Sequence, residues 1–166
     1  MKKIIILFVL SIIINACSSN EDNIEKDTYT YSFYKNSKLT INEVEDSYMK
    51  EGKIDSGDKL VFKYLFSAYD NKEVADDEFN SEVIMFEIDP NISSFTYSDS
   101  QLLDIKSVFT KYCFCVFSNE QTDKDVAPTG TISGTKISDK YWDIKINVTF
   151  YGNEVKTVNK KFTLMN

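Results

Sequence analysis

The chain has 166 residues, and its 26 acidic side chains against 19 lysines give a formal net charge of −7. This acidic balance argues against nucleic acid as a partner, because phosphate backbones bind basic surfaces. Histidine and arginine are both absent. Their absence excludes a serine–histidine–aspartate or cysteine–histidine nucleophilic site, imidazole ligation of zinc, and guanidinium recognition of phosphate.

The first seventeen residues read MKKIIILFVLSIIINAC. Lys2 and Lys3 provide a positive start, and residues 4–14 are apolar apart from Ser11. The apolar run is about half of the roughly 20 residues that a membrane-spanning helix requires. A short apolar run after a charged start is typical of a secretory signal peptide. A short buried helix is the alternative for the same residues.

The end of this segment, with Ile14, Ala16 and Cys17, resembles the lipobox of bacterial lipoproteins. The resemblance implies that residues 1–16 are a signal peptide that is removed. It also implies that Cys17 receives a diacylglyceryl group on its sulfur and an acyl chain on the new N-terminus. Two or more acyl chains anchor a protein stably to a membrane, so we expect an N-terminal lipid anchor. A signal peptide without lipidation is the alternative.

Residues 17–27 continue from the cysteine into a polar, acidic run with too little apolar surface to pack. This run predicts a flexible tether between the anchor and the rest of the chain. Ser18, Ser19, Glu21 and Asp22 also resemble the short acidic export signal that follows the lipidated cysteine in outer-membrane lipoproteins of the Bacteroidota. That resemblance implies display on the cell surface, whereas a solvated linker explains the same residues without an export role.

From residue 28 onward the apolar residues recur with period two, the pattern of half-buried β-strands. The pattern predicts a single β domain over residues 28–166. Strands are predicted at residues 29–34, 39–41, 59–69, 81–89, 95–97 and 110–117, with polar loops at 42–58 and 70–80 and a short helix within 100–109.

The C-terminal part predicts an antiparallel meander with short turns. Its three strands are expected at residues 130–137, 141–151 and 155–164. In the middle strand Trp142 shares its face with four apolar residues, and the other face is polar. Gly134 interrupts the first strand, where Ile132 and Ile137 differ in parity, so we expect a β-bulge there.

About eight strands at intervals of about ten residues predict an all-β fold. The expected architecture is an antiparallel two-sheet sandwich of immunoglobulin-like type, without the disulfide and intervening tryptophan of immunoglobulin domains. A lipocalin-like β-barrel with an internal ligand pocket is the alternative.

Cys113 and Cys115 are two residues apart in a predicted strand, so their side chains point to the same side with Cα atoms about 6.6 Å apart. This separation is at the long end of the disulfide range. Two small apolar core residues and a strained disulfide are the main interpretations. A redox or metal role is a third, although two thiols without further ligands make a poor metal site.

Oxygen ligands concentrate in the acidic loop, where Asp70, Asp76, Asp77 and Glu78 are calcium candidates. Calcium takes six to eight oxygen ligands. The spacing does not match the EF-hand pattern, because Lys72 stands where a ligand is needed. An ordinary solvated loop is the alternative interpretation, and no metal is assigned.

Two tyrosines are candidates for a contact surface. Trp142 is in phase with aliphatic residues and is predicted to lie in the core. Its neighbour Tyr141 and the more distant Tyr151 fall on the wetter face of the same strand. We therefore expect Tyr141 and Tyr151 to be available to a partner.

These patterns predict a non-enzymatic, lipid-anchored lipoprotein of the outer membrane, exposed at the cell surface. Its β domain is expected to bind a protein or a glycan, or to be a structural member of an envelope complex, without a cofactor. A small-ligand carrier with a β-barrel pocket is one alternative. A hydrolase with paired carboxylates is another, although no motif marks such a pair among the 26 acidic residues.

Overall fold

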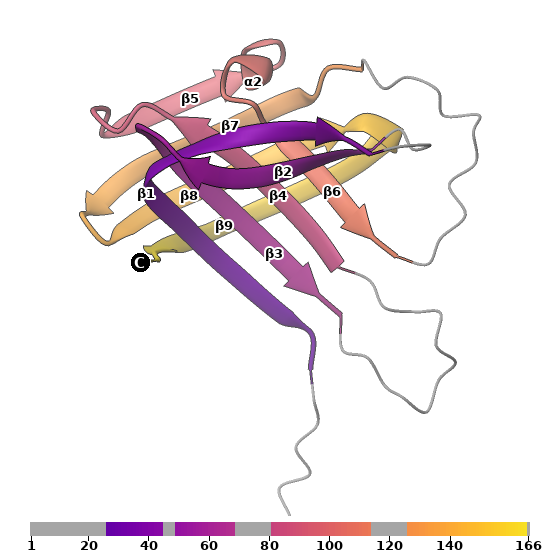
Figure 1. Ribbon diagram of the computed structural model, residues 1–166, viewed down its shortest axis with the longest axis horizontal. Coiled ribbons are helices and arrows are strands. Elements are labelled where there is room, and N and C mark those ends of the chain that lie inside the picture. Colours follow the sequence, from indigo (N-terminus) through magenta and orange to yellow (C-terminus); the bar gives the residue numbers. More distant parts are fainter. Residues whose placement is uncertain (1–25, 45–48, 69–80, 114–125, 166) are drawn as a thin grey trace, which may run out of the picture.

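The structure is a computed structural model that describes residues 26–44, 49–68, 81–113 and 126–165. Figure 1 shows that β1, β3, β4 and β6 cross the direction of β7, β8 and β9 at a wide angle. The elements in chain order are β1 (Thr28–Glu43), β2 (Lys50–Ser56), β3 (Lys59–Ser67), β4 (Ser81–Ile88), β5 (Ser94–Ser98), α2 (Gln101–Asp104), β6 (Val108–Tyr112), β7 (Thr129–Ser138), β8 (Tyr141–Phe150), the 3₁₀ turn η1 (Tyr151–Asn153) and β9 (Glu154–Leu164).

The strands form one open, hydrogen-bonded path, in the order β5-β7-β8-β9-β1-β3-β4-β6, and β2 pairs with β1 outside this path. The pairings are antiparallel except that of β1 with β9, which is parallel and joins Ser32 to Thr163 and Phe33 to Leu164. The all-β prediction is confirmed. The sheet is not closed into a barrel, so the lipocalin-like alternative is wrong. The immunoglobulin-like two-sheet sandwich stays a prediction, because the strands form one hydrogen-bonded path and not two separate sheets.

The main core lies between two halves of the sheet, one made of β5 and the meander β7–β9 and the other of β1, β3, β4 and β6. It is created by the alternation of buried apolar residues with exposed residues along the strands. In β8 the even-numbered residues from Trp142 to Phe150 are buried, and the intervening side chains are exposed or partly exposed. Trp142 is only 1% exposed, as the sequence predicts. Its indole meets the Phe62 ring of β3 edge-on at 5.6 Å, and Phe62 stacks on Phe86 of β4 at 4.9 Å. Aromatic packing therefore joins the C-terminal meander to the β3-β4 half.

A second, smaller core lies on the other face of β3, β4 and β6. Strand β1 changes register between Tyr34 and Ser37, where Asn36 has a positive φ of 51°. Beyond this point β1 pairs with β2, and the two form an arm, Ser37–Glu43 with β2, that crosses the sheet (Figure 1). Leu39 of the arm packs in this core with Val61, Val83, Met85 and Val108 of the sheet, and Ile41, Ile54 and Leu65 pack around them.

Strand β2 lies within residues 42–58, for which the sequence predicts a polar loop, so that prediction is wrong. The strand contains one strongly apolar residue, Ile54, and places Gly52 over the second core. A Cβ atom on Gly52 would lie 3.0 Å from the Met85 Sδ and 3.1 Å from Val108 Cγ1. The small residue thus lets β2 approach closely, a kind of contact that period-two hydrophobicity does not reveal.

The other elements agree with the prediction in kind but differ in their bounds. The expected short helix within residues 100–109 is confirmed, but α2 has only four residues, and the chain enters β6 at Val108 instead of residue 110. The predicted strands at 29–34 and 39–41 are one strand, β1. The expected β-bulge in β7 is confirmed: the register shifts between Lys136 and Ser138, where Ile137 is the extra residue. No helix of the described residues is long and apolar enough to span a membrane.

Candidate functional site

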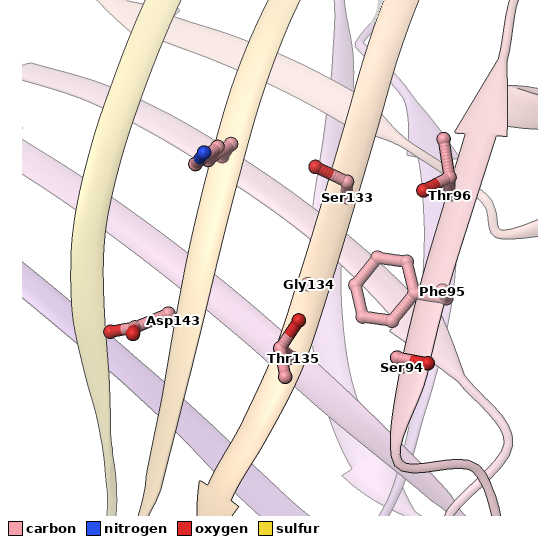
Figure 2. A pocket seen from close by; sticks show the side chains of 8 residues that line it. Ser94, Phe95, Thr96, Ser133, Gly134, Thr135 and Asp143 are labelled. Atoms are coloured by element: carbon pink, nitrogen blue, oxygen red, sulfur yellow. The ribbon is translucent and has the colours of Figure 1, made fainter.

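The outer face of β5, β7 and β8 carries short polar side chains around a shallow depression of about 610 Å³. Figure 2 shows side chains from these three adjacent strands, with Ser133 and Thr135 of β7 between β5 and Asp143 of β8. We call the six polar lining residues the hydroxyl face. They are Ser94, Thr96, Ser133, Thr135, Asp143 and Lys145.

Strand register arranges the hydroxyl face in two rows. One row contains Ser94, Thr135 and Asp143, which are paired across β5, β7 and β8. The other row contains Thr96, Ser133 and Lys145, paired in the same way. Directly opposite residues in a sheet have Cβ atoms about 5 Å apart. On β8, one row therefore ends in the anionic Asp143 and the other in the cationic Lys145.

Gly134 and Phe95 form the floor of the depression. They are paired in register on β7 and β5, and Phe95 is 9% exposed. A Cβ atom on Gly134 would lie 2.5 Å from Phe95 Cε1 and 2.6 Å from Ile144 Cδ1. The missing side chain lets the Phe95 ring lie against the β7 backbone, which fixes the edge strand β5 beside β7.

The polar atoms of the hydroxyl face are available to a ligand. Within the described ranges, no side-chain hydrogen bond or ion pair is made by Ser133, Thr135 or Asp143, nor by the other three members of the face. By contrast, the neighbouring pair Ser98 and Thr131 joins its hydroxyl oxygens at 3.1 Å. Hydroxyl groups both donate and accept hydrogen bonds, a carboxylate accepts and an ammonium donates. The face can therefore bind a ligand rich in hydroxyl groups.

This lining does not match a glycosidase site. Hydrolysis of glycosides commonly requires two carboxyl groups about 5–10 Å apart on either side of the bond. The residues that line the depression include a single carboxylate, Asp143. The geometry therefore favours binding of a polar ligand over hydrolysis at this place.

The two tyrosines proposed from the sequence differ in exposure. Tyr141 is 41% exposed and precedes Asp143 by two residues on the outward side of β8, with Lys161 Nζ 5.7 Å from its ring centroid. Tyr151 is only 5% exposed and packs near the Phe109 ring at 6.3 Å. The prediction that Tyr151 is an outer contact residue is therefore wrong, because the chain leaves strand geometry at η1 and turns this ring inward.

Most of the other predicted site residues lie outside the described residues. They are Cys17, Cys115 and the calcium candidates Asp70, Asp76, Asp77 and Glu78. Cys113 is disulfide-bonded, and its pairing with Cys115 stays a prediction. Among the residues that the structure describes, no group of three or more cysteine or acidic side chains is placed to hold a metal ion.

Sequence reasoning missed the hydroxyl face. Its signal is the alternation of serine and threonine with inward residues in 94–98 and 129–135, which by itself also fits any solvated strand. Only the pairing of β5 with β7 brings the two segments together. Comparisons of the chain with protein-family models, curated proteins and solved structures found no match.

Proposed function

We propose that this protein is a non-enzymatic, lipid-anchored lipoprotein of the outer membrane whose hydroxyl face binds a glycan. The lipobox resemblance at Cys17 supports the anchor, and the acidic residues after it support surface display. The observation that carries the binding role is the set of six polar side chains on three adjacent strands, none bonded to another described residue.

A glycan fits this face better than an apolar molecule does. Pockets for apolar ligands are lined mainly by hydrophobic and aromatic side chains, whereas this lining has four hydroxyls and two charges around a single aromatic residue. Sugar hydroxyls can exchange hydrogen bonds with serine and threonine while accepting from the Lys145 ammonium and donating to the Asp143 carboxylate. The shallow, open form suits a chain of sugars lying along the strands.

Other partners are distinguishable by experiment. A protein partner remains the second candidate, since the exposed Tyr141 ring lies on the same outward side of β8. A carrier that holds its ligand inside a closed barrel lacks support, because the sheet is open.

Glycan binding is tested with the full chain carrying Cys17→Ser, which blocks lipid attachment, on an array of bacterial and host glycans. We expect binding that falls about tenfold in the Ser133→Ala/Thr135→Val double variant, since each lost hydrogen bond contributes about 0.5–1.5 kcal/mol. Asp143→Asn is expected to weaken binding as well. Asp104→Asn, an exposed carboxylate on α2, is the matched control. Capture of no glycan, or equal loss in the control, contradicts this site.

The anchor and its orientation are tested in cells. With the native chain, protease added to intact cells is expected to remove the β domain while a periplasmic marker survives. Cys17→Ser is expected to leave an uncleaved or soluble form. Normal membrane retention of Cys17→Ser would exclude lipidation at this residue, and protection of the native domain until the cells are broken would place it on the periplasmic side.

A further inference from the structure

A second hollow, of about 300 Å³, lies on the opposite side of the fold, between the β1–β2 arm and the turn that follows α2. We call it the arm pocket. Its lining combines apolar side chains with two lysines, a serine and a tyrosine. The residues that line it are Ile41, Lys50, Leu103, Lys106, Ser107, Val108, Val126, Pro128 and Tyr151.

Ser107 gives the arm pocket an unused hydrogen-bonding group. This residue is 8% exposed, and its Oγ is the buried side-chain polar atom of the described chain that has no hydrogen-bond partner. Buried polar side-chain atoms are nearly always hydrogen-bonded in folded proteins. An unpartnered hydroxyl that lines a cavity is therefore a group that a bound molecule can satisfy.

Lys106, next to this hydroxyl, is held in place by the fold. Its Nζ lies 2.7 Å from the Oε1 of the buried Glu87 and donates to the Leu39 carbonyl at 3.0 Å. An ammonium has three donors, so one remains, and the Lys106 side chain is 44% exposed. Its backbone has a positive φ of 51°. A non-glycine residue in this region is uncommon, and such residues cluster at functional sites.

The positive charge of the pocket exceeds its negative charge. Lys50 lines the pocket as a second lysine, and the lining contains no carboxylate. Glu87 balances only Lys106. The Lys50 backbone is fixed by other groups, because its carbonyl accepts a hydrogen bond from Thr110 Oγ1 at 2.8 Å. The backbone of Lys50 is thus held between β2 and β6. The Lys50 side chain has no anionic partner among the described residues.

We propose that the arm pocket binds a small organic carboxylate with an apolar body. The ligand's carboxylate would accept hydrogen bonds from the Ser107 hydroxyl and from the lysine ammonium groups, which are the donors that carboxylates prefer. Its apolar body would lie against Leu103, Val108 and Val126. A volume of about 300 Å³ is at the lower limit for small-molecule sites, so the ligand is small. This site is separate from the hydroxyl face and does not depend on the proposed glycan function.

The test uses the ¹⁵N-labelled full chain with Cys17→Ser, titrated with octanoate and followed by NMR. We expect saturable shifts at the amides of Leu103, Ser107 and Val108. Acetate, which has the carboxylate without the body, and 1-octanol, which has the body without the charge, are expected to bind at least about tenfold more weakly, a difference of about 1.4 kcal/mol. Absence of octanoate shifts at these amides, or equal affinity for all three probes, overturns the proposal.

Two pairs of variants locate the binding. Lys50→Gln is expected to weaken octanoate about tenfold, while Lys63→Gln on β3, outside the pocket, leaves the affinity unchanged. Leu103→Asp places a negative charge on the exposed apolar wall and is expected to abolish binding. Ile137→Asp makes the same change at a similarly exposed residue of β7. Equal loss in a variant and its control means that octanoate binds elsewhere and contradicts the site.

Discussion

Two buried serines differ in whether the hydroxyl group has a hydrogen-bond partner. Ser107 Oγ is buried and unpartnered, whereas Ser37, which is similarly buried at 7% exposure, donates to the Lys35 carbonyl at 3.0 Å. A buried polar group left unpaired costs about 1–3 kcal/mol, and a satisfied hydrogen bond contributes about 0.5–1.5 kcal/mol. Replacing each of these serines with alanine should therefore change the free energy of unfolding in opposite directions.

We expect Ser107→Ala to raise the free energy of unfolding by about 1 kcal/mol and Ser37→Ala to lower it by about 1 kcal/mol. Urea unfolding of the full chain with Cys17→Ser measures both, and an unchanged m-value confirms that the variants unfold in the same way. If Ser107→Ala destabilises the fold as much as Ser37→Ala, the Ser107 hydroxyl has a partner in solution, such as an ordered water.

At the scale of elements, glycines fix two strands against their cores. Gly134 in β7 leaves room for the Phe95 ring of β5, and Gly52 in β2 lies over Met85 of β4. The Cβ atom that alanine would add comes within 2.5 Å of the Phe95 ring at Gly134. At Gly52 it comes within 3.0 Å of a flexible methionine side chain. The β5–β7 contact is therefore the less tolerant of the two.

We expect Gly134→Ala to destabilise the protein by about 1–3 kcal/mol, since overpacking forces side chains and backbone to shift. It should also weaken glycan binding, because Ser133 and Thr135 flank the displaced position. Gly52→Ala is the control and is expected to cost less. Thermal unfolding of both variants checks this order, and a larger loss at Gly52 would show that β5 adjusts to the added methyl group.

At the scale of the whole molecule, a charged network connects the C-terminal meander to β4 and β6. Lys156 Nζ of β9 lies 2.8 Å from Glu82 Oε1 of β4 and 3.1 Å from Glu154 Oε2, while Lys111 Nζ of β6 lies 3.5 Å from Glu154 Oε1. Burial raises the pKa of Glu154, but the hydrogen bonds and charges of Lys156 and Lys111 outweigh it, and the pKa falls below its usual value of 4.5.

A carboxyl group with a lowered pKa in the folded state stabilises the fold above its unfolded pKa and loses this contribution as the pH falls through the folded value. We therefore expect the stability of the protein to decline below about pH 4.5, partly through Glu154. Glu154→Gln should lower stability at neutral pH and flatten this decline. Glu43→Gln, an exposed carboxylate on β1, should do neither. Urea unfolding from acid to neutral pH compares them, and an equally steep decline in Glu154→Gln would assign the acid response to other groups.

A strand is predicted well from the sequence when its own residues form an apolar pattern, and poorly when distant residues hold it in place. β3, β4 and β8 bury apolar residues in clear period-two or continuous runs, and their positions are predicted closely. β2 is held by Gly52 and Ile54 against a surface built from β4 and β6, which are distant in the chain, so its own residues do not identify it.

The candidate sites are less accessible to prediction. Each row of the hydroxyl face requires the pairing of β5 with β7 and β8, and isolated serines and threonines carry no sign of it. The arm pocket depends on the positive φ of Lys106 and on the fold of the arm over β6. The strand pattern misplaces Tyr151 because it continues one residue beyond β8, into η1.

The parallel pairing of β1 with β9 has a consequence for biogenesis. It joins Ser32 and Phe33 to Thr163 and Leu164, about 130 positions along the chain. Contacts between such distant residues are slow to form, and this one must wait until residue 164 has been synthesised. β1 can pair with β2 and β3 as soon as these have emerged, but its other edge stays without β9 until the end of synthesis. For a polypeptide whose first residues resemble an export signal, the sheet can therefore be completed only after its last strand has been synthesised.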